Sequence, residues 1–153
     1  MNNAHLHLLL NHLSITFVII GFIVMLFGFL FKSDIAKRIA YLIFILAALF
    51  GFVTFQTGEG SKPLIEGIKG VNKISIITHE KTALIFLFFL YLLGAFSIVG
   101  LWANWKKKSF SNLLGYSIMV YLFVVFYYAI QAGTTGGEIR HLEIIPLVEN
   151  SDV

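Results

Sequence analysis

The sequence predicts an all-α integral membrane protein, a four-transmembrane-helix bundle with both termini on the outer, periplasmic side. Its 153 residues are 58% hydrophobic and 16% aromatic, and their mean hydropathy of +0.88 lies far above that of soluble domains. Four runs contain no charged residue: 13–31, 39–55, 82–102 and 113–130. Each run has roughly the 17 to 25 residues needed to cross a bilayer as a helix. Backbone amides in lipid must pair within their own segment, so we expect these runs to be helices.

The four runs extend to expected helices at about 8–32, 38–56, 79–104 and 111–132 in one membrane domain, 1–153. An outer loop, 57–78, joins the second helix to the third, and a C-terminal tail covers 133–153. Apolar residues at helical spacing in the loop predict a short amphipathic helix on the membrane surface: Leu64, Ile65, Ile68, Val71 and Ile74. A loosely packed loop over the bundle is the alternative, because Gly67 and Gly70 weaken a helix.

The distribution of charge predicts the orientation. One short loop joins the first run to the second, and another joins the third run to the fourth. Their charged residues are Lys32, Asp34, Lys37, Arg38, Lys106, Lys107 and Lys108. These loops sum to +5 and the other segments to −2, which reproduces the formal net charge of +3. The positive-inside rule makes the two loops cytoplasmic, in the inner membrane of a bacterium. The basic balance therefore follows from topology and requires no nucleic acid.

The chain has no cysteine, which excludes covalent c-type haem attachment, iron–sulfur clusters, thiolate metal sites and disulfides. Any metal or haem must be held by nitrogen or oxygen ligands. The N-terminus lacks the positive segment of a cleavable signal peptide, so the first helix is expected to remain in the membrane. No catalytic serine motif, phosphate-binding loop or carboxylate within the apolar runs supports hydrolysis or group transfer.

The two halves of the chain resemble each other. Each half has a histidine before an apolar run, a basic turn, a second run, and then a glutamine followed by a glycine-rich segment. This order predicts a pseudo-twofold axis along the membrane normal, with His12 and His79 as mates that face each other. Chance similarity between apolar segments is the alternative.

All five histidines fall at the predicted outer ends of the helices. Two imidazoles opposed across a bundle are a common way to hold a b-type haem, so His12 and His79 are the expected axial ligands of one haem b. His7 and His141 are further candidates, and His5 is expected to be a tail residue. Each of these side chains has an alternative role as an ordinary interfacial polar group.

Further residues are expected around the haem. Gly21 and Gly51 leave room for a flat macrocycle, although close helix packing in lipid also accounts for them. Arg140 is placed to pair with haem propionates at the outer rim, with a solvated tail residue as the alternative.

The segment HLHLLLNHLSI, Thr57-Gly58, His79 and GGEIRH at 136–141 resemble motifs of a family of small bacterial four-helix membrane proteins. This family is catalogued as domain of unknown function 2231. The resemblance spans nearly the whole chain and implies a four-helix fold with His7, His12, His79 and His141 as its important residues, in a haem-binding, redox-linked role. This chain has Leu8 and Ser14 where the family motif has prolines.

Three functions remain open at this point. The first is electron transfer by a b-type haem at the outer face, in exchange with a periplasmic cytochrome or quinol, as a subunit or partner of a respiratory complex. The second is a zinc or copper site formed by three or four histidines. The third is a structural or accessory subunit of a larger membrane complex. The first and third functions make the protein an electron-transfer or accessory subunit rather than an enzyme.

Overall fold

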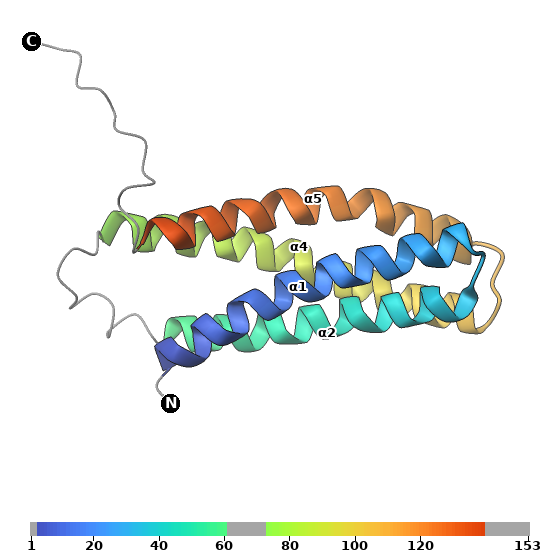
Figure 1. Cartoon of the computed structure of the whole chain (residues 1–153), viewed down its shortest axis with the longest axis horizontal. Helices are drawn as coiled ribbons and strands as arrows, with labels where there is room; N and C mark the ends of the chain where they lie inside the picture. Colours follow the sequence, from blue (N-terminus) through green and yellow to red (C-terminus); the bar gives the residue numbers. More distant parts are fainter. Residues whose placement is uncertain (1–2, 61–72, 140–153) are drawn as a thin grey trace, which may run out of the picture.

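The computed structural model describes residues 3–60 and 73–139, which form four long helices (Figure 1). They are α1 (Asn3–Leu30), α2 (Asp34–Glu59), α4 (Lys73–Trp105) and α5 (Ser111–Glu138). Each helix contains a stretch that is long and apolar enough to cross a membrane. The predicted all-helical class and the four apolar spans are therefore confirmed.

The helices are longer than the hydropathy pattern indicated. α4 begins at Lys73, inside the predicted outer loop, and α5 continues to Glu138, inside the predicted tail. Hydropathy marks only the part of a helix that lies in hydrocarbon, whereas backbone hydrogen bonds extend the helix into the polar region beyond it. Apart from Ile74, the apolar positions of the predicted surface helix lie outside the described residues.

Two tight turns close the helical hairpins at the same end of the bundle. Lys32 and Lys107 both have φ of 50°, a left-handed conformation usually taken by glycine. The amide of Ser33 donates to the carbonyl of Gly28 at 2.9 Å, and the amide of Lys108 donates to that of Ala103 at 2.9 Å. Both turns are Schellman motifs, which satisfy the last carbonyls of α1 and α4.

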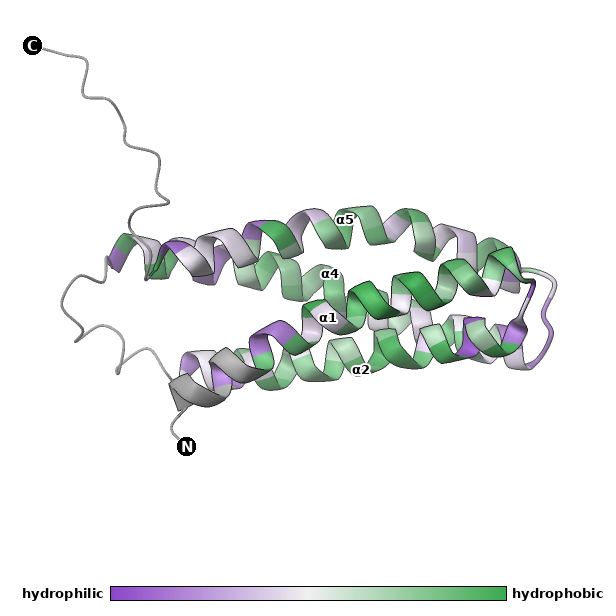
Figure 2. Ribbon diagram, viewed as in Figure 1, coloured by the Kyte–Doolittle hydropathy of each residue, from purple (hydrophilic) through white to green (hydrophobic). Residues whose placement is uncertain are grey.

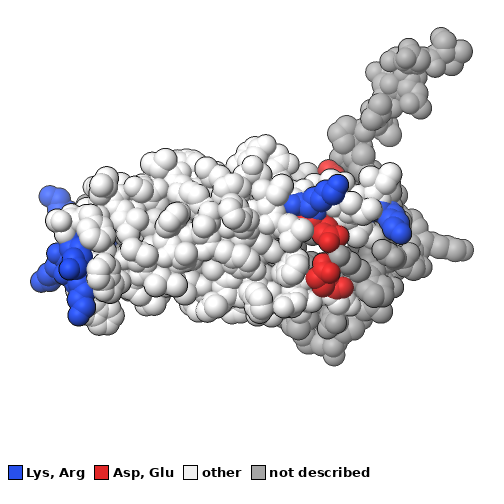
Figure 3. Space-filling model, turned by 180° about the vertical axis from the view of Figure 1, so that it is seen from behind, with Lys and Arg blue, Asp and Glu red and all other residues white. Residues whose placement is uncertain are grey.

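We call the end with these turns the basic end, and the opposite end, which carries His7 and His79, the histidine end. Lysine and arginine side chains gather at the basic end, whereas acidic and basic side chains are mixed near the histidine end (Figure 3). The surface between the two ends is apolar (Figure 2). Many large side chains on this surface, such as Phe88 and Phe123, are exposed, as expected for helices that contact lipid.

The core runs along the middle of the bundle and is fully buried around Phe44, Leu90, Leu93 and Leu122. Small residues bring α2 and α4 together, because a Cβ added at Gly94 would lie 2.7 Å from the Cβ of Ala48. Close packing of small residues is the usual means of joining helices in lipid.

The two hairpins, α1–α2 and α4–α5, separate toward the histidine end (Figure 1). α1 and α5 have few contacts, although each packs closely on its hairpin partner. Two ring pairs join α1 to α5: Phe29 stacks on Tyr116 at 4.3 Å between centroids, and Phe22 meets Phe126 edge-on at 5.5 Å. The hairpins are thus joined in the middle and at the basic end.

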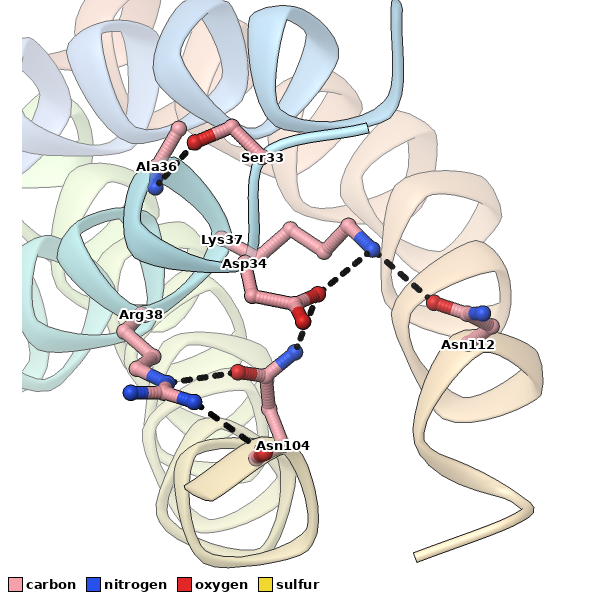
Figure 4. A network of polar contacts seen from close by, with 7 residues as sticks. All are labelled: Ser33, Asp34, Ala36, Lys37, Arg38, Asn104 and Asn112. Atoms are coloured by element: carbon pink, nitrogen blue, oxygen red, sulfur yellow. Dashed lines mark hydrogen bonds and ion pairs between the residues drawn. The ribbon is translucent and has the colours of Figure 1, made fainter. Parts of the chain in front are cut away.

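A polar network ties the helices together at the basic end (Figure 4). The buried Lys37 donates from Nζ to Asp34 Oδ1 at 3.2 Å and to Asn112 Oδ1 at 2.9 Å. Asn104 donates to the same Asp34 oxygen at 3.3 Å and accepts from Arg38 Nε at 2.7 Å. The side chain of Asn104 therefore links α2 to α4.

Candidate functional site

The imidazole of His7 lies against α2. Its Nδ1 is 2.9 Å from the carbonyl oxygen of Thr54. The ring covers Gly58, where an added Cβ would lie 2.9 Å from Cε1 of His7 and 3.0 Å from Nδ1. The ring can occupy this position only because residue 58 has no side chain.

The imidazole of His79 lies against α5 in a matching way. Its ring hydrogen-bonds the backbone of Ala132, and its Nδ1 is 3.3 Å from the hydroxyl oxygen of Thr135. A Cβ added at Gly136 would lie 3.0 Å from Cε1 of His79.

The two settings correspond residue by residue. His79 follows His7 by 72 positions, whereas Ala132 and Gly136 each follow their counterparts Thr54 and Gly58 by 78 positions. The stacked pair Phe17–Phe50 has its counterpart in the stacked pair Phe89–Tyr128 at the same two separations. Buried residues of α1 correspond to buried residues of α4 in the same register: Ser14, Val18, Gly21, Met25 and Gly28 with Phe86, Leu90, Leu93, Ser97 and Gly100.

The hydrogen bond to a carbonyl fixes the tautomer of His7, and the contacts of His79 are compatible with the same tautomer. A carbonyl oxygen only accepts, so Nδ1 of His7 donates the proton to Thr54. The Thr135 hydroxyl donates to the carbonyl of Gln131 at 2.9 Å, which leaves its oxygen free to accept from Nδ1 of His79. In the neutral rings, Nε2 then carries a lone pair. This is the state in which histidine ligates a metal ion, with the other nitrogen held by a carbonyl or hydroxyl.

The side chain of His12 is exposed, whereas those of His7 and His79 are partly buried. The five residues between His7 and His12 correspond to about 140° of rotation around an α-helix, so the two side chains cannot share a face. The backbone of His5 lies in the first turn of α1, and its side chain lies outside the described part, as do Arg140 and His141.

Gly21 and Gly51 lie in the core away from the two histidines. A Cβ at Gly21 would lie 2.5 Å from the ring of Phe44, and one at Gly51 would lie 2.7 Å from Leu90. These contacts are close helix packing, which was the alternative role considered for both glycines. The glycines that touch the histidines are Gly58 and Gly136, which the sequence did not single out as ring contacts. The repeated Thr-Gly pair, at 57–58 and 135–136, is the signal that marks them.

Within residues 3–60 and 73–139, no group of three or more histidine, aspartate or glutamate side chains is arranged to hold a metal ion. The described site therefore offers two imidazoles. Comparison with protein-family models, curated proteins and solved structures gives no match. The functional argument rests on the geometry of the two histidines.

Proposed function

We propose that this protein binds one b-type haem through Nε2 of His7 and Nε2 of His79 and transfers electrons at the outer face of a bacterial inner membrane. The observation that carries the proposal is the matched setting of the two rings. Each Nδ1 is held by a hydrogen bond to the neighbouring helix, and each Nε2 is left with its lone pair. Haem iron accepts two such nitrogens as axial ligands.

The number of ligands favours haem over zinc or copper. A structural zinc site takes four protein ligands and a catalytic one takes three, whereas haem supplies four nitrogens of its own and needs two more. The described site supplies two imidazoles, one from each hairpin. Small four-helix bundles build haem sites from side chains on facing helices in this way.

The matched settings also support the internal repeat in a revised register. We propose that α1–α2 and α4–α5 are two copies of one helical hairpin, with His7 and His79 as equivalent residues. Equivalent hairpins present equivalent ligands to the two faces of a planar group. The axis that relates them runs along the membrane normal, because each hairpin begins at the histidine end and turns at the basic end.

The protein's own residues have distinct tasks in this function. Thr54 holds the ring of His7 in one orientation, and Thr135 together with Ala132 does the same for the ring of His79. Gly58 and Gly136 give the rings room. A haem held by His7 and His79 would supply one-electron redox chemistry, because both imidazoles would be used as ligands. By the positive-inside rule the site faces the periplasm, so the electron partner is a periplasmic cytochrome or quinol, alone or within a respiratory complex.

The visible spectrum of the purified protein, reconstituted with haem b, tests the proposal. We expect a Soret band and a sharp α-band on reduction in the wild type, and loss of both bands in His7→Ala and His79→Ala. His12→Ala is the matched control and keeps the spectrum, because its side chain is exposed. Circular dichroism confirms that each variant is helical.

A wild-type protein that takes up no haem would overturn the proposal. If His12→Ala lost the pigment while His7→Ala retained it, haem binding would stand and the assigned ligand pair would be wrong. Metal analysis of the colourless protein then distinguishes a zinc or copper site from a structural subunit.

A further inference from the structure

The four-helix bundle has two seams between its hairpins, and they differ near the histidines. At the seam between α2 and α4, Phe55 lies one turn inward from Gly58, and its partly buried ring packs against the core. At the seam between α1 and α5, the position one turn inward from Gly136 is Gly133. A Cβ added at Gly133 would meet no atom within 4 Å among the described residues.

Gly133 lies on the side of α5 that faces α1. It follows Phe126 by seven residues, which places both on one face of the helix. Phe126 contacts Phe22 of α1. The contact between these two rings closes the α1–α5 seam toward the middle of the bundle, whereas beside Gly133 the seam is open. Figure 1 shows α1 and α5 separating in this direction.

We propose that one edge of the haem macrocycle lies in the α1–α5 seam beside Gly133. The inference rests on the proposed function. The iron is held between His7 and His79, so the macrocycle must extend sideways between the two hairpins. Phe55 fills one side of this space, and the absence of a side chain at Gly133 leaves the other side open.

Gly133→Leu tests the inference, with Thr134→Leu as the matched control. Thr134 is the next residue on α5 and is exposed, so its replacement adds the same side chain on a neighbouring face. We expect haem affinity, measured by titration of the Soret band, to fall at least tenfold in Gly133→Leu and to stay within twofold in Thr134→Leu. Leucine favours a helix over glycine, so the haem-free Gly133→Leu protein unfolds at an equal or higher denaturant concentration than wild type.

A second measurement reports on the seam directly. The chain has no cysteine, so Gly133→Cys and Thr134→Cys can each be labelled with a small maleimide before and after haem is added. We expect haem to slow labelling of Gly133→Cys at least tenfold and to leave Thr134→Cys unchanged. Unchanged haem affinity in Gly133→Leu, or unchanged labelling of Gly133→Cys, would overturn the seam inference alone. A wild type that binds no haem would overturn the proposed function and this inference with it.

Discussion

The ring of His79 lies directly over Gly136, so close that an added Cβ would stand 3.0 Å from its Cε1. We predict that Gly136→Ala moves the imidazole and weakens haem binding at least about tenfold, or about 1.4 kcal/mol. The measurement is haem titration followed at the Soret band. Thr134→Ala is the control, because Thr134 is exposed on a neighbouring face of the same helix.

Alanine favours a helix over both glycine and threonine, so neither variant is expected to unfold more easily than wild type. A lower haem affinity with unchanged stability therefore reports displacement of the ring and not loss of the fold. Equal haem affinity in Gly136→Ala and Thr134→Ala would show that the glycine beneath His79 is not needed for ligation.

The sequence predicted the fold more fully than the site, for a physical reason. Transfer of an apolar run into lipid depends on its composition, so the four spans can be found without knowing how the helices pack. Which histidine points inward depends on the rotation of α1 about its axis. His12 stands next to the apolar run and drew the prediction, yet the buried stripe through Ser14 and Val18 continues outward to His7.

Two other features were also not predicted from the sequence. Lys32 and Lys107 take a left-handed conformation that is usually found at glycine, so the sequence did not indicate the Schellman turns. Asn104 bonds side chains that come from the start of α2, far away in the sequence. Sequence spacing within one helix carries no information about such partners.

We predict that Asn104→Ala lowers the free energy of unfolding by about 1 to 3 kcal/mol, the usual contribution of hydrogen bonds to charged groups. Asn104 is 4% exposed, and its removal takes a hydrogen bond from Arg38 and another from Asp34. Denaturant unfolding in detergent, followed by tryptophan fluorescence, measures the loss. Asn112→Ala should cost less, because Asn112 is exposed and Lys37 keeps its bond to Asp34. A smaller loss for Asn104→Ala than for Asn112→Ala would contradict the assigned role of the network.

Lys107 offers a stabilising substitution. Its φ of 50° is strained for a residue with a Cβ, and glycine takes this conformation freely. We predict that Lys107→Gly raises the free energy of unfolding by about 1 kcal/mol in the same assay. Lys106→Gly removes the same charge at a residue whose φ is not positive, and it should give no gain. An equal change in both variants would mean that charge, and not backbone conformation, sets the effect.

The orientation of the bundle is open to a direct test because the chain has no native cysteine. Gly60 follows α2 at the histidine end in a right-handed conformation with φ of −69°, so Gly60→Cys introduces no backbone strain. Ser109 is exposed beside the lysines of the basic end, and Ser109→Cys leaves those charges in place. The basic loops are held on the cytoplasmic side by the positive-inside rule. We therefore predict that a membrane-impermeant maleimide labels Gly60→Cys in intact spheroplasts, and that it labels Ser109→Cys only after the membrane is opened. The reverse pattern would place His7 and His79 at the cytoplasmic face and exclude a periplasmic electron partner.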